Sequence, residues 1–159
     1  MVTMKALVAY YSRTGRTKDA AETIANSLKA DIEEISEGSS RRGIFGFLKS
    51  GREGALKKTP RIKKPLKDII DYDIAIIGMP IWAGKMASPV RSYVKTYGKE
   101  AKQIALFCTH GGGGGDPALS EIEHIMGKKA IAKIELTTND TSKINEFSDF
   151  VQKTYKSSK

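Results

Sequence analysis

The chain has 159 residues, of which 40% are hydrophobic and 28% are charged, with a formal net charge of +9 at pH 7. This length and composition suit a single globular domain over residues 1–159 with its own core. The longest apolar stretch, at residues 74–83, is shorter than the ~20 residues that a membrane-spanning helix needs, so no membrane partner is predicted.

The first half of the chain predicts two strands around one helix. Residues 5–10 form an almost unbroken apolar run, which is typical of a strand buried on both faces of a parallel sheet. Residues 20–28 place apolar side chains at spacings of three and four, which predicts an amphipathic helix. Residues 31–36 predict a weaker, peripheral strand. Residues 41–65 are irregular and glycine-rich, with an apolar patch at 44–48 that can start a short helix.

The second half continues this alternation. Strands are predicted at residues 74–78, 103–108 and 130–136. Helices are predicted at 89–97 with Ser88 as N-cap, from Pro117 with Asp116 as N-cap and Gly127 as the stop, and at 144–155. Five strands alternating with helices predict a doubly wound, five-stranded parallel α/β sheet with helices on both faces. Ligands of such sheets bind at the carboxyl ends of the strands, near the point where the strand order reverses.

The positive charge is concentrated in one segment. Residues 41–67 hold ten basic residues and one acid, Glu53, whereas the rest of the chain holds 17 basic and 17 acidic residues. A local positive face favours an acidic partner or a polyanion, and a solvated face that binds nothing is the alternative. The single cysteine excludes an intramolecular disulfide, and residues 1–5 lack the features of a signal peptide. We therefore expect a cytoplasmic protein.

The first strand is followed by a turn of small and polar residues that leads into a helix. Such a turn suits a phosphate, because a helix N-terminus gathers unpaired N–H groups and the positive end of the helix dipole. Ser12, Thr14 and Thr17 add hydroxyl donors, and Gly15 lets the backbone approach an anion closely. Ordinary N-capping is the alternative, but it needs only one hydroxyl. The turn matches neither the P-loop pattern nor the three-glycine dinucleotide fingerprint.

Two later strands also end in unusual loops. The only tryptophan, Trp82, follows the clearest strand, where its ring can stack on a planar ligand or pack under its own loop. Cys108, Thr109 and His110 precede five glycines, whose N–H groups can cradle the polar edge of a ring or form a flexible loop. We predict a packed Cys108 thiol and an exposed His110 that can place positive charge near a ligand. With His124, these two residues make a poor zinc set.

Together, the three loops make the sequence similar to the flavodoxin family over nearly the whole chain. The most specific match is YYSRTGRT at residues 10–17, which resembles the S/T-x-T-G-x-T phosphate loop of that family. The resemblance implies a flavodoxin-like sheet of order 2-1-3-4-5 and a bound FMN, whose chemistry the protein tunes by stacking, backbone hydrogen bonds and charge. It implies a phosphate surrounded by Ser12, Arg13, Thr14, Gly15, Arg16 and Thr17. It also implies a ring face covered by Pro80, Ile81, Trp82, Ala83, Gly84, Lys85 and Met86, and a pyrimidine edge held by Cys108, Thr109, His110, Gly111 and Gly112.

Two departures from the family bear on function. Arg16 stands where many members have asparagine, which adds positive charge at the phosphate site. The chain is also basic, whereas flavodoxins are usually acidic. The basic segment 41–67 therefore predicts docking to acidic redox proteins, such as ferredoxin-like partners.

The resemblance implies an electron-transfer protein that shuttles electrons between redox partners through FMN. The alternative is an NAD(P)H-dependent FMN or quinone reductase on the same fold, because Gly84 and Met86 also resemble the quinone-reductase branch. A nucleic-acid-binding module is less favoured, because Phe45 and Phe47 are spaced for packing rather than base stacking. No Ser-His-Asp or paired-carboxylate pattern is legible in the sequence, so no catalytic residue and no metal site is predicted.

Overall fold

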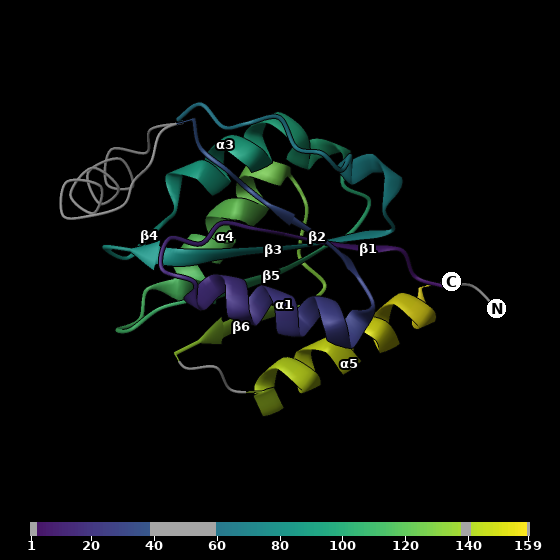
Figure 1. Cartoon of the computed structure of the whole chain (residues 1–159). Coiled ribbons are helices and arrows are strands. Elements are labelled where there is room, and N and C mark those ends of the chain that lie inside the picture. The colour runs from purple at the N-terminus through teal and green to yellow at the C-terminus, as the bar shows by residue number, and fades with distance from the viewer. Residues whose placement is uncertain (1–2, 39–59, 138–140, 159) are drawn as a thin grey trace.

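The computed structural model describes residues 3–38, 60–137 and 141–158, and a sheet with helices on both faces forms its centre (Figure 1). The elements in chain order are β1 (Ala6–Tyr10), α1 (Arg16–Leu28), β2 (Asp31–Glu34), η1 (Ile69–Asp71), β3 (Ile74–Trp82), β4 (Lys85–Met86), α3 (Ser88–Tyr97), η2 (Gly98–Glu100), β5 (Ile104–Thr109), α4 (Gly115–Met126), β6 (Lys133–Leu136) and α5 (Thr141–Ser157). No helix within these ranges is long and apolar enough to cross a bilayer. The apolar patch at 44–48 lies outside the described residues.

The sheet has the predicted strand order. Five parallel strands lie in the order β2-β1-β3-β5-β6, which is 2-1-3-4-5 when these five are counted along the chain. The order reverses between β1 and β3, so the carboxyl ends of these two strands flank the position where doubly wound sheets bind ligands. The structure adds one strand that was not predicted, the two-residue β4, which pairs antiparallel with the end of β3.

Each face of the sheet packs against two helices. Leu7 and Ala9 of β1 belong to the core shared with α3 and α4, whereas Ala6, Val8 and Tyr10 point into the core shared with α1 and α5. Figure 1 shows these two helix pairs on opposite sides of the strands. Because successive side chains of a strand alternate between faces, burial on both sides makes β1 an apolar run in the sequence.

Two predicted helix starts were wrong. The N-cap of α3 is Ala87 rather than Ser88, and the N-cap of α4 is Gly114 rather than Asp116. Gly114 has a φ of 84°, a left-handed conformation that favours glycine, so the backbone turns into the helix before Asp116 is reached. The predicted stop of this helix is confirmed, because Gly127 forms its C-cap with a φ of 68°.

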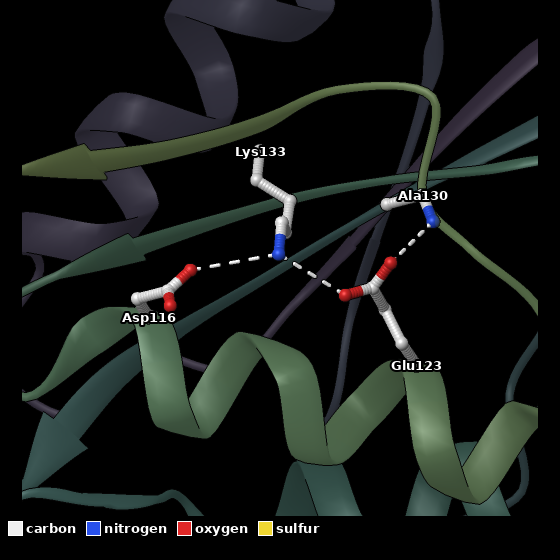
Figure 2. A network of polar contacts seen from close by, with 4 residues as sticks. All are labelled: Asp116, Glu123, Ala130 and Lys133. Atoms are coloured by element: carbon white, nitrogen blue, oxygen red, sulfur yellow. Dashed lines mark hydrogen bonds and ion pairs between the residues drawn. The ribbon is translucent and has the colours of Figure 1, made fainter.

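An ion-pair network fixes the edge strand β6 against α4 (Figure 2). The ammonium of Lys133 on β6 lies 3.1 Å from Glu123 Oε1 and 3.5 Å from Asp116 Oδ1, both on α4. The other carboxylate oxygen of Glu123 accepts the Ala130 N–H at 2.8 Å. Burial acts to raise the pKa of Glu123, but the Ala130 N–H and the Lys133 ammonium outweigh it and hold this pKa below its ordinary value.

Candidate functional site

The turn between β1 and α1 has the geometry of an anion site. Gly15 is the N-cap of α1 with a φ of 97°, and a Cβ at this position would meet no atom within 4 Å. The Gly15 N–H donates to Ser12 Oγ at 3.1 Å, and that hydroxyl retains its own proton to donate. The first-turn N–H groups of α1 have no partner within the helix, as at any helix start. The turn therefore offers open space, amide donors and a hydroxyl at one point.

Two arginines supply positive charge at this turn. Arg16 is exposed at the first position of α1, and Arg13 is half-buried just before it. Thr14, between them, is also exposed. The acid in the first turn of this helix is Asp19, whose N–H donates to the Gly15 carbonyl at 2.9 Å. The two arginines outnumber this carboxylate, so the electrostatic balance at the helix start still favours an anion.

A buried hydrogen bond joins this turn to the end of β5. The hydroxyls of Thr17 and Thr109 lie 2.8 Å apart, and the two residues are only 2% and 4% exposed. Thr17 belongs to the first turn of α1, and Thr109 is the last residue of β5, so the bond spans the carboxyl end of β3 between them. Two of the three predicted loops are thus tied together at their base.

The loop after β3 is a tight hairpin. β3 and β4 pair through Ile81 with Met86 and through Trp82 with Lys85, and Ala83 and Gly84 form the turn with φ values of 49° and 71°. Positive φ at both central residues is the geometry of a type I′ turn, which matches the twist of paired strands. This hairpin was not predicted, because Ala-Gly is not among the dipeptides that indicate a type I′ hairpin turn.

Trp82 packs on the protein rather than standing free. It is 8% exposed, and its ring lies edge-to-face with Tyr11, with ring centroids 5.4 Å apart and an interplanar angle of 88°. The Tyr11 hydroxyl in turn donates to Glu37 Oε1 at 2.8 Å. Of the two roles weighed for Trp82, the structure shows packing, here against the residue that begins the phosphate turn. This contact joins the second predicted loop to the first.

The side chains of the hairpin differ in their access to a ligand. Met86 is fully buried in the core, whereas Ala83, Gly84 and Lys85 are exposed. Pro80 and Ile81 are half-buried, and Pro80 pairs with Thr109 across the β3–β5 ladder. The exposed turn of the hairpin is therefore its most accessible part.

The glycine loop touches the hairpin turn. A Cβ placed on Gly114 would lie 3.0 Å from Gly84 Cα, so the two backbones approach as closely as glycine allows. Gly111 and Gly112 are exposed, and a Cβ at either would meet nothing within 4 Å. All three predicted loops are therefore in mutual contact, and open space remains beside the glycines.

His110 is held by two hydrogen bonds, so the prediction of an exposed histidine was wrong. Its side chain is 9% exposed. Nε2 lies 2.8 Å from Glu135 Oε2, and Nδ1 accepts the Gly113 N–H at 2.9 Å. Glu135 was not predicted as a partner of His110. In the sequence, only the alternation of polar and apolar residues in β6, which places Lys133 and Glu135 on one face of the strand, could have pointed to it.

Cys108 is a packed thiol, as predicted. It is fully buried, and burial raises its pKa to about 12, with the charges of Glu135 and Asp116 acting in the same direction. Because the thiolate is the nucleophilic form, this residue is inert near neutral pH. Within the described ranges, no group of three or more His, Cys, Asp or Glu side chains could hold a metal ion.

Comparison with solved structures identifies the fold. A flavoprotein from Lactobacillus acidophilus, crystallised in complex with FMN, is 25% identical and aligns over 91% of this chain and 99% of its own, with a TM-score of 0.72. This chain has a flavodoxin-like fold. A flavoprotein from Bacteroides uniformis is 22% identical over 93% and 99% of the two chains, with a TM-score of 0.81. A flavodoxin from the domain Archaea is 21% identical over 94% and 98%, with a TM-score of 0.61.

No family model matches the sequence of this chain. The Bacteroides and archaeal proteins share its fold at sequence identities of only 22% and 21%. The ligand that the site can bind therefore has to be inferred from the residues of this chain. The open cradle at Gly15 and the unfilled space beside Gly111 and Gly112 fit a phosphorylated ligand with a flat polar edge.

Proposed function

We propose that this chain binds FMN as one domain and carries electrons between redox proteins. The observation that supports it most directly is the meeting of three loops at the carboxyl ends of β1, β3 and β5, joined by the Thr17–Thr109 bond and by the approach of Gly84 to Gly114. An anion site, an aromatic hairpin and a row of free glycine amides are the three parts that a flavin mononucleotide needs. The bound FMN supplies the electron-transfer chemistry.

Each loop has a separate role in this proposal. Residues Ser12, Arg13, Thr14, Gly15, Arg16 and Thr17 hold the phosphate through amides, hydroxyls and charge. The hairpin residues Pro80, Ile81, Trp82, Ala83, Gly84, Lys85 and Met86 cover one face of the ring. Residues Cys108, Thr109, His110, Gly111 and Gly112 hold the pyrimidine edge. The edge-to-face contact with Tyr11 uses at most one face of the Trp82 ring, and the other face is the one we propose for stacking.

The reductase is the alternative, and it differs from the carrier in using NAD(P)H to reduce the bound FMN. Hydride transfer to a flavin needs no side-chain nucleophile, so the buried Cys108 thiol and the engaged His110 ring do not separate the two functions. Steady-state oxidation of NAD(P)H with a quinone tests this directly. We expect turnover no faster than free FMN supports, and brisk turnover would replace the carrier proposal with the reductase.

The central test is FMN binding itself. Added FMN should be bound with loss of its fluorescence, and riboflavin, which lacks the phosphate, should bind more weakly. Arg16→Glu should weaken FMN about 10-fold or more while leaving riboflavin unchanged, because a charge-assisted hydrogen bond is worth about 1.5–3 kcal/mol. Lys153→Glu makes the same charge change at an exposed position on α5 and serves as the control. Equal affinity for FMN and riboflavin would contradict the phosphate site.

The partner we propose is an acidic redox protein that docks on the basic segment 41–67. In its described part, Arg61, Lys63 and Lys64 are exposed, and Leu66 is 92% exposed beside them. An apolar tip ringed by positive charge suits a partner with carboxylates around an apolar contact. Residues 41–59 of the segment lie outside the described residues, and they carry further basic side chains in the sequence.

Stopped-flow reduction by an acidic plant-type ferredoxin tests this docking. The rate should fall steeply with ionic strength, because steering between opposite charges is screened by salt. Replacing Lys63 and Lys64 by glutamate should lower the rate at low salt about tenfold or more. The matched control replaces exposed Lys129 and Lys153. Equal rates in both double variants at every salt concentration would reject the basic segment as the docking face.

A further inference from the structure

The hydrogen bonds of His110 determine its tautomer. A backbone N–H can only donate, so the 2.9 Å contact from Gly113 requires an acceptor lone pair on Nδ1. The proton of the neutral ring then sits on Nε2 and is donated to the Glu135 carboxylate at 2.8 Å. An imidazolium carries protons on both nitrogens and has no acceptor, so it cannot keep the Gly113 bond.

The Glu135 carboxylate lies against the start of α4. A Cβ placed on Gly115 would lie 2.5 Å from Glu135 Oε2 and 2.8 Å from Cys108 Sγ. The strand that carries Glu135 is tied to α4 by Lys133, whose ammonium contacts Glu123 and Asp116 (Figure 2). Glu135 therefore orients the His110 ring from a strand that is held in place.

The bond to Gly113 sets the shape of the glycine loop. Gly113 has a φ of 97° and Gly114 a φ of 84°, and these two residues reverse the chain between the end of β5 and the start of α4. The exposed residues Gly111 and Gly112 lie between His110 and its bonded partner, within a closed ring of atoms. Fixing Gly113 thus fixes the direction of the amides that precede it.

We propose that His110 is a positioning residue, which holds Gly111 and Gly112 in their FMN-binding arrangement through the Nδ1 acceptor of its neutral ring. This inference rests on the proposed FMN site. His110 itself need not touch FMN, because it acts through the loop. Loss of the Nδ1 acceptor by substitution releases the loop and weakens FMN.

The charged and titratable groups around His110 come from three elements. Glu135 on β6 contacts the ring directly. The carboxylates of Glu135 and of Asp116 on α4 both act on the Cys108 thiol on β5, and Lys133 pairs with Asp116. Of these groups, only Glu135 bonds the ring, through Nε2, which leaves Nδ1 to accept the Gly113 N–H.

Three variants at one position separate the two contacts. Asparagine places an oxygen acceptor where Nδ1 stands, and glutamine places an N–H donor where Nε2 stands. We expect His110→Asn to keep FMN affinity within about twofold of wild type. His110→Gln and His110→Ala should each weaken FMN about five- to tenfold, the usual worth of one neutral hydrogen bond. Thermal melts of the FMN-free proteins identify any variant that fails to fold.

The two amide variants separate positioning of the loop from the contact with Glu135. Retention of affinity in His110→Gln with loss in His110→Asn would assign the effect to Glu135 and overturn the proposal.

Amide exchange in the FMN-free protein distinguishes failure of this inference from failure of the proposed function. The Gly113 amide should be protected in wild type and in His110→Asn, and should exchange about tenfold faster in His110→Ala. If wild type binds no FMN but Gly113 shows this pattern, the proposed function fails and the loop contact stands. If Gly113 exchanges equally fast in all three proteins, the positioning role is overturned whether or not FMN binds.

Discussion

The buried bond between Thr17 and Thr109 should behave as a coupled pair. Replacing either residue by valine keeps the shape of the side chain but leaves the other hydroxyl without this partner, at 2% or 4% exposure. An unsatisfied buried hydroxyl costs about 1–3 kcal/mol, so each single variant should lose about 2 kcal/mol of unfolding free energy. For a domain of this size, that lowers the Tm by roughly 4–8 °C. The double variant removes both hydroxyls, so its stability should return close to wild type.

Urea unfolding of the FMN-free protein measures this cycle. The coupling energy is the change in unfolding free energy of the double variant minus the sum of the changes in the two single variants. It should offset most of the stability that the single variants lose. Thr23→Val is the control on the same helix, because the Thr23 hydroxyl bonds only the Asp19 carbonyl one turn back, at the exposed surface. Its effect should stay within about 0.5 kcal/mol. Additive losses in the double variant would refute a shared buried bond between the two loops.

Three further predictions concern the packing of Gly78, the ion pair of Glu123 and the thiol of Cys108. Gly78→Ala would place a Cβ 1.9 Å from Cζ of the fully buried Phe107 ring, so urea unfolding should show a loss of about 1–3 kcal/mol, whereas Gly38→Ala, with no atom within 4 Å, should be neutral. The pKa of Glu123 is lowered from its ordinary value of 4.5, so its carboxylate stabilises the fold fully above pH 4.5 and progressively less as the pH falls below that value. The difference in unfolding free energy between wild type and Glu123→Gln should therefore shrink in acid. A difference that stays constant with pH would contradict this. Cys108, buried and with a pKa raised to about 12, should resist Ellman's reagent at pH 8 and react fully in guanidinium, and rapid reaction of the native protein would show the burial to be wrong.

Local pattern was sufficient to predict the five parallel strands and the three strand-end loops, whereas the strand order came from the resemblance to the flavodoxin family. Residues such as Leu7 and Val8 are apolar because both faces of β1 are covered, and this burial is written directly into a continuous apolar run. Gly15 and its neighbouring hydroxyls mark a helix start that exceeds what capping needs. These features depend on residues close together in the chain, so the sequence alone predicts them, along with a flavodoxin-like architecture.

Contacts between distant residues were decided only by the tertiary structure. Thr17 and Thr109 are 92 positions apart, and His110 and Glu135 are 25 apart, so no local spacing announces either pair. Trp82 was predicted to stack on a ligand or to pack under its own loop, and its ring contact with Tyr11, 71 positions earlier in the chain, could not be predicted from local sequence. Likewise, α4 has its N-cap at Gly114, two residues before the predicted N-cap Asp116, and Gly114 lies against Gly84 of the hairpin.

The sequence by itself therefore predicted which loops lie at the strand ends, and the fold decided which of their side chains contact one another. Strand periodicity and turn chemistry act over a few residues, so they can be read from the local sequence. Hydrogen-bond partners and ring contacts depend on which strand ends meet, and sheet order and register settle that. For this protein, His110 was predicted to be exposed, and the fold instead holds its ring between Glu135 and Gly113.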